Sequence, residues 1–243
     1  MLKHPAYRYI GGELEEAVIK SDITLEELIS LSDKVLLAEK NITSFLSGGP
    51  YLNMLFWGEK GSGKSTLLRA LTLKYSCQGL VAVEYMDSNP AGVYGLYKII
   101  RANPDNKFII YFDDISFDNG DSSYKRFKSI VEGGLEEKPE NTLFAATSNK
   151  RHLVADSVMD TEDIYNRDEI NEKTSLHTRF GLSIGFYPLS KDDYLKICNM
   201  YFDKYSITPP LGWEKDAEAF AIDRGGRSGR LAKQFAAYIA ITN

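Results

Sequence analysis

The chain has 243 residues, of which 43% are hydrophobic and 26% are charged, and its formal net charge is −5. These values are ordinary for a folded protein and argue weakly against one that coats nucleic acid, although they leave room for a local basic groove. The two cysteines, Cys77 and Cys198, show neither metal-ligand spacing nor a disulfide framework. With no apolar core of a signal peptide at the start and no run of roughly 18 apolar residues, we expect a cytoplasmic protein that does not span a membrane.

The first part of the chain gives weak local signals. Residues 1–22 are mixed in character and are predicted to form an N-terminal helix or arm. Thr24 followed by Glu27, in TLEELISL, has the form of a capping box and predicts the start of a helix. A further helix is expected over about 34–47, where SGGP ends it.

From residue 52 onward, predicted strands and helices alternate. The predicted strands are 52–57, 79–85, 107–114, 141–149 and 181–187, and the helices between them are 65–76, 92–102, 122–134 and one that ends at SLHTRF. Buried apolar strands that alternate with helices imply a parallel sheet covered on both faces. We therefore predict an α/β domain over residues 23–187 with five parallel strands.

The remaining segments differ in character from this domain. After Pro188 the pattern is helical only, which predicts a small helical second domain over residues 188–243. Residues 151–173 hold seven Asp or Glu against three Lys or Arg. They are either a solvated connection or an assembly or partner surface.

A glycine-rich loop carries the strongest functional signal. Residues 58–65 read GEKGSGKS, a complete G-x-x-x-x-G-K-S between a predicted strand and a predicted helix. Small residues let such a loop wrap phosphates with its backbone N–H groups, and the helix N-terminus adds partial positive charge. We expect Lys64 to reach the β and γ phosphates and Ser65 to bind Mg²⁺. The predicted nucleotide-binding residues are Gly58, Glu59, Lys60, Gly61, Ser62, Gly63, Lys64, Ser65 and Thr66.

Two aspartates end the apolar strand FIIYFDDISF. Asp113 is expected to join Ser65 in holding Mg²⁺, and Asp114 to orient the attacking water. Many P-loop ATPases carry a glutamate at the second position, so the carboxylate of Asp114 is set back by about 1.5 Å. A misplaced base can cost on the order of a hundredfold in rate, which predicts slow hydrolysis. Glu132 is another carboxylate that could approach, and two acids that merely cap a strand are the structural alternative.

Three further polar side chains extend the candidate site. Asn149 ends a predicted strand and is expected beside the γ-phosphate, with a turn cap as the alternative. Arg179 precedes the fifth strand, where an arginine finger could enter a neighbouring subunit's site; a surface salt bridge is the alternative. Arg230 lies in the first turn of a helix that Ser228 could cap. The helix dipole disfavours a cation there, so a ligand anion would explain it, unless it belongs to a basic patch. The predicted catalytic residues are Lys64, Asp114, Asn149, Arg179 and Arg230.

The order of phosphate loop, acidic strand end, polar sensor, finger and lid arginine resembles that of AAA+ ATPases over residues 23 to about 240. The stretches FDDISFDNGDSSYKRFKSIVEGG, ATSNKRHL and SLHTRFGLSIGF resemble a bacterial family of uncharacterised ATP-binding AAA+ proteins, domain of unknown function 815. This family carries Asp-Asp, which implies that Asp114 is a family feature. Thr178 stands where the family usually has Asp, which weakens the assignment of Arg179.

The resemblance also implies a fold, cofactors and an assembly. It implies a P-loop NTPase fold of the AAA+ class, with a five-stranded parallel sheet and a helical lid, and it implies ATP and Mg²⁺ as cofactors. It implies a homo-oligomeric ring, often of six subunits. Ile23 or Ile29 would then lie near the adenine.

Three functions compete. The leading hypothesis is a ring ATPase that remodels or moves an unknown macromolecule; Tyr94 could line its pore, although an ordinary turn tyrosine is favoured. The second is an ATP-dependent switch or loader for nucleic-acid machinery, because Asp-Asp-Ile-x-Phe also resembles bacterial replication initiators. Against it, residues 86–106 hold one helix only, no helix-turn-helix follows, and the acidic balance offers no evident phosphate-binding face. The third is a scaffold that binds ATP without turnover, which the intact Lys64, Ser65 and Asp113 disfavour.

Overall fold

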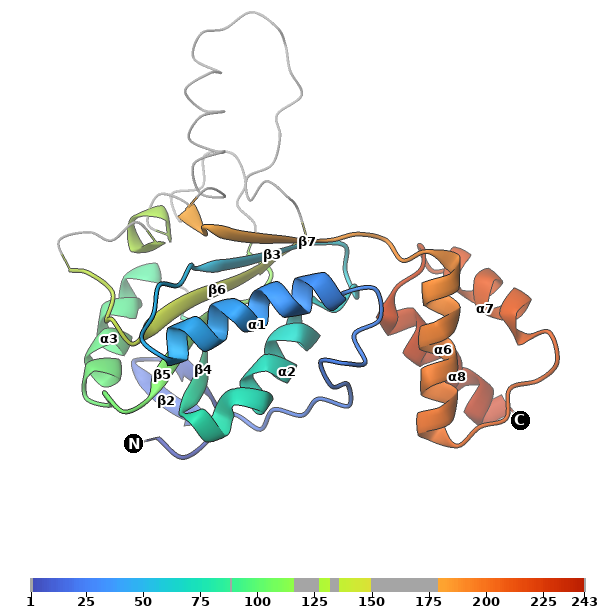
Figure 1. Cartoon of the computed structure of the whole chain (residues 1–243), viewed down its shortest axis with the longest axis horizontal. Helices are drawn as coiled ribbons and strands as arrows, with labels where there is room; N and C mark the ends of the chain where they lie inside the picture. The colour runs from blue at the N-terminus through green and yellow to red at the C-terminus, as the bar shows by residue number, and fades with distance from the viewer. Residues whose placement is uncertain (1, 88, 116–126, 132–135, 150–178, 243) are drawn as a thin grey trace, which may run out of the picture.

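A seven-stranded sheet forms the centre of the molecule (Figure 1). The computed structural model describes residues 2–87, 89–115, 127–131, 136–149 and 179–242. The strand order is β2-β1-β4-β5-β6-β3-β7, and every neighbouring pair is parallel except β1 with β2. The five predicted strands are all present, as β3 (Met54–Gly58), β4 (Leu80–Tyr85), β5 (Lys107–Phe112), β6 (Thr142–Ser148) and β7 (Leu182–Phe186).

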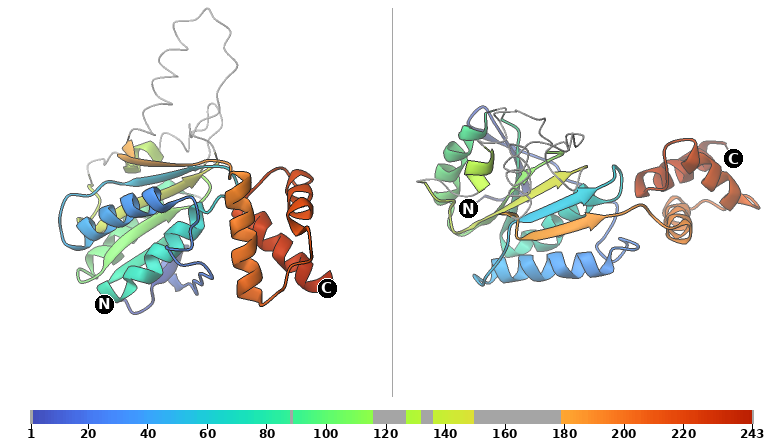
Figure 2. Two further views of the ribbon diagram at one scale, coloured as in Figure 1. Left: turned by 45° about the vertical axis from the view of Figure 1, so that its right-hand side comes forward. Right: turned by 90° about the horizontal axis from the view of Figure 1, so that it is seen from above.

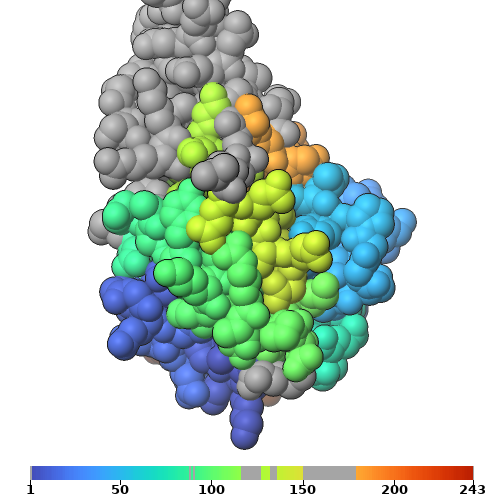
Figure 3. All heavy atoms as spheres, turned by 90° about the vertical axis from the view of Figure 1, so that its left-hand side faces the viewer, coloured from blue at the N-terminus to red at the C-terminus, as the bar shows by residue number. Residues whose placement is uncertain are grey.

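The N-terminal residues add the two strands that the prediction lacked. β1 (Ala6–Ile10) and β2 (Glu13–Glu16) form a hairpin, and β1 pairs with β4, so the sheet is wider than five strands and residues 6–16 form neither the helix nor the separate arm that were the two expectations. Tyr9 is 2% exposed and stacks on Tyr85 with ring centroids 5.6 Å apart. Figure 3 shows the N-terminal residues in dark blue at the lower margin of the molecule, beside the green segments near residue 100.

Residues 23–31 also depart from the prediction, because they form no α-helix. The Thr24 N–H donates to Glu27 Oε2 at 2.9 Å, which is one half of a capping box. The chain then turns at Ser30, whose φ of 67° is incompatible with a right-handed helix. The helix α1 begins at Ser32 and ends at Leu46.

Helices cover both faces of the sheet (Figure 2). α1 and α2 (Lys64–Tyr75) pack on one face, and α3 (Val93–Arg101) packs on the other with a helical turn at residues 127–131. Side chains alternate accordingly: Phe56 belongs to the first core and its neighbour Leu55 to the second. The apolar runs are buried on both sides, as a parallel sheet requires.

Three helices form a C-terminal bundle beyond the carboxyl ends of β3 and β7, and this bundle is referred to below as the lid (Figure 1). They are α6 (Lys191–Tyr205), α7 (Trp213–Ile222) and α8 (Gly229–Thr242). Rings of Phe202, Trp213 and Phe235 build their common core, with Phe202 and Trp213 edge to face at 4.9 Å. Within the described ranges, no helix is long and apolar enough to cross a membrane.

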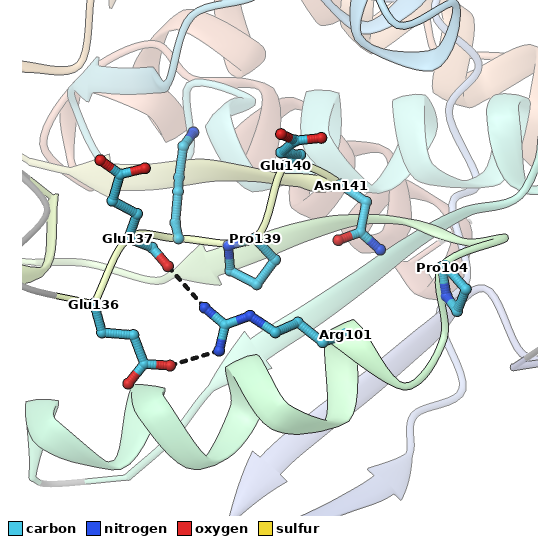
Figure 4. Close-up of a pocket in the computed structure, with 8 residues that line it drawn as sticks. Arg101, Pro104, Glu136, Glu137, Pro139, Glu140 and Asn141 are labelled. Carbon is cyan, nitrogen blue, oxygen red and sulfur yellow. Dashed lines mark hydrogen bonds and ion pairs between the residues drawn. The ribbon is translucent and has the colours of Figure 1, made fainter.

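The opposite end of the sheet carries an open hollow of about 690 Å³ at the start of β6. Figure 4 shows Arg101 reaching between Glu136 and Glu137 on its wall. Its guanidinium lies 2.5 Å from Glu136 Oε1 and donates to the Glu137 carbonyl at 2.9 Å. These contacts hold residues 136 and 137 against α3, so we interpret the hollow as structural.

Lys138, on the same wall, is a half-buried cation held by neutral groups. Its Nζ donates to Asn53 Oδ1 at 3.0 Å and to the Thr142 carbonyl at 3.1 Å, and it lies 4.7 Å from the Tyr51 ring centroid. Both acceptors have a second donor, the Phe144 N–H and the Tyr51 hydroxyl respectively. Burial lowers the pKa of Lys138 from 10.5 to about 8.

Replacing Lys138 by methionine is therefore expected to stabilise the protein at pH 7. The folded state binds fewer protons than the unfolded state between pH 8 and 10.5, so the stability of the unmodified protein rises with pH through that window. Below pH 8 the cost of desolvation applies, which is at most on the order of 3 kcal/mol because the side chain is partly exposed to water, and the methionine variant avoids it. Urea unfolding at pH 7 and pH 10 measures the difference, which should shrink at the higher pH.

The exposed Lys215→Met is the matched control and should show no such pH-dependent gap. A Lys138→Met variant that is less stable at pH 7 would contradict the prediction. The ring contacts and hydrogen bonds of Lys138 would then outweigh its desolvation.

Candidate nucleotide-binding site

The predicted phosphate loop connects β3 to α2, and its glycines are required by geometry. Gly58 has a φ of 134°, and a Cβ on it would collide with the backbone of Phe186. Gly61 has a φ of 77°, and its Cβ would come within 2.9 Å of the Cβ of Arg230. The loop therefore runs directly against both β7 and the lid.

Lys64 begins α2 and is folded back onto the loop. It is 8% exposed, and its Nζ donates to the carbonyls of Gly58 at 2.6 Å and Glu59 at 2.8 Å. A third hydrogen bond of 3.2 Å reaches Asn149 Oδ1. Burial lowers the pKa of Lys64, and the carboxylates of Asp114 and Asp113 oppose that shift.

Asp113 follows β5 and gathers three hydroxyl groups around one carboxylate oxygen. Its Oδ1 accepts from Thr147 Oγ1 at 2.6 Å and from the hydroxyl of Tyr111, and Ser65 Oγ lies 3.4 Å from it. Tyr111 Oη also lies 3.1 Å from Ser65 Oγ. Burial raises the pKa of Tyr111, and the Asp113 carboxylate adds to that shift.

Tyr111 and Thr147 are site residues that the sequence reasoning missed. Tyr111 precedes Asp113 by two positions on a strand, and residues two apart share a face of a sheet. Thr147 likewise precedes Asn149 by two positions on the neighbouring strand. The spacing of two residues from a predicted site residue was the signal in the sequence that could have identified Tyr111 and Thr147.

Asp114 adopts a left-handed backbone with a φ of 49°. Among residues with a side chain, aspartate and asparagine tolerate this region best. The Asp114 N–H donates to Thr147 Oγ1 at 2.8 Å, and Asp114 Oδ1 accepts from Asn149 Nδ2. Asn149 thus contacts both Lys64 and Asp114.

The lid closes the site from the other side. The Arg230 N–H donates to the Gly61 carbonyl at 3.3 Å, and the charge of Arg230 contributes to the lowered pKa of Lys64. The expected cap of α8 forms, because Ser228 Oγ accepts the Leu231 N–H at 3.3 Å. Arg230 is therefore placed where the lid meets the loop.

A pocket of about 470 Å³ lies between the loop, the strand ends and the lid. Its walls include residues 60–66, Asp113, Asp114, Asn149 and Arg230. Ile23 and Ile29, the expected adenine contacts, line it as well, while Gly58 and Glu59 contribute the carbonyls that hold Lys64.

Ion pairs join the segment that carries Ile23 and Ile29 to the lid. Asp22 Oδ2 lies 2.5 Å from Lys233 Nζ, and Glu27 Oε2 lies 2.7 Å from Lys204 Nζ. The lid position is thereby coupled to the wall of the pocket.

Arg179 is the one predicted site residue of the described ranges that lies far from this pocket. Because β7 runs parallel to β3 with Leu182 beside Met54 and Phe186 beside Gly58, Arg179 lies at the opposite end of the sheet from the loop. A strand of five residues spans about 16 Å. Arg179 is exposed at that end and does not line this pocket.

The remaining candidate residues either lie outside the described residues or pack within the fold. Thr178 and Glu132 lie outside the described residues, as do residues 151–173. Tyr94 lies in the first turn of α3, half-buried and edge to face with Tyr97 at 5.8 Å. This packing favours the ordinary structural role over a pore residue.

A family model described as "Protein of unknown function (DUF815)" matches residues 3–242 of the chain. The chain belongs to this family. No curated protein matches it. The family assignment agrees with the resemblance seen in the acidic strand end and the sensor strand.

Solved structures show that this DUF815 chain has the AAA+ P-loop fold. The Thermotoga maritima RuvB Holliday junction branch migration motor superposes with a TM-score of 0.58 at 14% identity, over 87% of this chain and 62% of that one. The DUF815 chain thus spans less than two thirds of RuvB. The FIGL-1 AAA domain in complex with ADP superposes with a TM-score of 0.57 at 14% identity, over 90% of this chain and 73% of that one. A katanin structure concerned with self-assembly superposes with a TM-score of 0.51 at 17% identity, over 87% of this chain and 68% of that one.

Proposed function

We propose that this DUF815 protein is an ATPase that binds ATP with Mg²⁺ and works as a ring to remodel or move a macromolecule. The observation that carries the proposal is the convergence of Lys64, Ser65, Asp113, Asp114 and Asn149 on one pocket beneath the lid. Each of these side chains has the chemistry that phosphoryl transfer from a nucleotide needs.

The pocket fits a nucleoside triphosphate in size and in donors. A volume of 470 Å³ lies within the range of small-molecule sites. The first turn of α2 and the loop N–H groups supply donors and partial positive charge. Lys64 is held by neutral oxygens, which phosphate oxygens would replace with charged acceptors.

Ser65 and Asp113 fit a magnesium ion. Ser65 Oγ lies 3.4 Å from Asp113 Oδ1, so the two side chains are close enough to serve one cation, and both carry the hard oxygen ligands that Mg²⁺ prefers. Mg²⁺ keeps several waters and needs only one or two protein oxygens beside the phosphates. When bound, the cation neutralises charge that develops on the phosphates.

Asp114 and Asn149 are suited to hold the attacking water. The hydrogen bond from Asn149 Nδ2 fixes Asp114 Oδ1, which leaves the other carboxylate oxygen to accept a proton from water. Asn149 also accepts from Lys64, so one amide relates the phosphate-binding lysine to the water-binding carboxylate. Arg230 would reach the γ-phosphate from the lid.

The ring is proposed because Arg179 lies too far from its own pocket to act there. RuvB is a branch migration motor and katanin self-assembles, and both share the fold. An arginine finger from a neighbour would complete each site in such an assembly.

Lys64→Met tests nucleotide binding directly. We expect ATP affinity to fall by about a hundredfold or more, since truncating one partner of a buried charge pair costs roughly 2–5 kcal/mol. The nucleotide-free variant should unfold no more easily than the unmodified protein, because the burial that lowers the pKa of Lys64 also disfavours its charge in the folded state. Fluorescent ATP binding and thermal unfolding measure the two quantities, with Lys215→Met as control.

Turnover measured against protein concentration decides between the functions. A rate per subunit that rises with concentration supports the ring ATPase. Tight ATP binding with negligible turnover at every concentration supports the switch or loader for nucleic-acid machinery, or a scaffold. Absence of ATP binding to the unmodified protein contradicts the proposal.

A further inference from the structure

Two hydroxyl groups lie beneath the proposed magnesium ligands, and the proposed reaction assigns them no role. Tyr111 Oη contacts Asp113 Oδ1 and lies 3.1 Å from Ser65 Oγ. Thr147 Oγ1 is 2.6 Å from the same Asp113 oxygen. Both side chains come from adjacent parallel strands, β5 and β6, which fix their backbones.

The direction of each hydrogen bond follows from the donors available. A carboxylate only accepts, and Tyr111 has a single hydroxyl hydrogen, so that hydrogen goes to the charged oxygen of Asp113. Ser65 Oγ then donates to Tyr111 Oη at 3.1 Å in preference to Asp113 at 3.4 Å. Thr147 donates to Asp113 and accepts the Asp114 N–H at 2.8 Å.

This chain of hydrogen bonds sets what the two ligands present to the pocket. The hydrogen of Ser65 is directed to Tyr111, so the lone pairs of Ser65 Oγ are available to a cation. Asp113 Oδ1 is occupied by Tyr111 and Thr147, so its second oxygen is the one available to the cation or to a water of its shell. Without the Tyr111 hydroxyl, Ser65 would donate to Asp113 or turn its hydrogen toward the pocket.

We propose that Tyr111 is a positioning residue for the magnesium–nucleotide complex, orienting Ser65 and Asp113 so that both offer lone pairs to one cation. The inference rests on the proposed function, because it requires a nucleotide and a cation in this pocket. Partners that orient metal ligands from behind typically contribute 10–100-fold to metal affinity. A rigid strand residue suits this task better than a loop residue, because β5 pairs on both sides.

Tyr111→Phe removes only the hydroxyl and keeps the ring. We expect affinity for a fluorescent ATP analogue in EDTA to stay within about twofold, while the Mg²⁺ concentration for half-maximal tightening rises by about 10–100-fold. Thr147→Val, which removes the second hydroxyl, should also raise the Mg²⁺ concentration needed for half-maximal tightening. Tyr51→Phe is the control, because its hydroxyl binds backbone carbonyls of Glu140 and Thr142 at the other end of the sheet.

The outcomes separate this inference from the function on which it rests. If the unmodified protein binds ATP with Mg²⁺ dependence and Tyr111→Phe matches Tyr51→Phe, the inference is overturned and the proposed function stands. If the unmodified protein binds no ATP with or without Mg²⁺, both fail. If Tyr111→Phe does not fold, the Mg²⁺ dependence of Thr147→Val is compared with that of Tyr51→Phe instead.

Discussion

Alanine in place of Arg179 is expected to lower ATP turnover by about a thousandfold or more, while each subunit still binds ATP. An arginine finger contributes about 10³–10⁵ to turnover in P-loop enzymes. The parallel register of β3 and β7 puts Arg179 at the far end of its own sheet, so its loss leaves the pocket of that subunit intact. Steady-state turnover and fluorescent ATP binding measure the two effects.

Mixing two inactive variants tests whether the finger acts between subunits. Arg179→Ala subunits keep an intact Lys64, and Lys64→Met subunits keep an intact Arg179. A mixed ring therefore contains some complete sites and should regain part of the turnover. No recovery on mixing would contradict a finger supplied by a neighbour. Arg8→Ala is the control, because Arg8 pairs with Glu84 at 3.5 Å on the hairpin side of the sheet.

Most of the sheet could be predicted because its signal is local. Runs such as KFIIYF and TLFAAT are buried on both faces, so burial, length and turn residues alone mark them as parallel strands. The hairpin could not be predicted in the same way. β2 reads ELEE and is an exposed edge strand, and its partner β1 reaches the sheet by pairing with β4, more than 70 residues later.

The segment over residues 24–31 shows how a correct burial pattern can give the wrong structure. Leu25, Leu28 and Leu31 are all buried, as the spacing for a helix would require. The chain nevertheless turns at Ser30, and Glu27 pairs with Lys204 of the lid. Ser30 also contacts Asp193, so two residues of this segment are held by a helix far away in the sequence, and no local pattern contains these contacts.

The phosphate loop was predictable because eight consecutive residues define it, whereas the support beneath it was not. Tyr111 and Thr147 come from two strands, and their contact with Asp113 depends on which strands are neighbours. The sequence predicted five parallel strands without their order. The order β5-β6-β3 places Asp113, Thr147 and the loop side by side.

Asp114→Asn is expected to lower turnover by about 10²–10⁴-fold, the usual contribution of a general base, with ATP and Mg²⁺ binding unchanged. The substitution changes charge and little else. Asparagine tolerates the left-handed backbone at this position as aspartate does, and its amide oxygen can accept the hydrogen bond from Asn149. Single-turnover hydrolysis of bound ATP measures the effect, with Asp87→Asn outside the pocket as control. Unchanged hydrolysis would show that Asp114 is not the base.

Asp114→Glu tests why this chain carries the shorter carboxylate at this position. The longer side chain would regain about 1.5 Å of reach, which alone predicts faster hydrolysis. Glutamate, however, lacks the tolerance of aspartate for a φ of 49°, and its extra methylene would displace the carboxylate from Asn149. We therefore expect a stability loss on the order of 1 kcal/mol and no gain in turnover. A faster and equally stable Asp114→Glu variant would show that the backbone of Asp114 does not explain the shorter side chain.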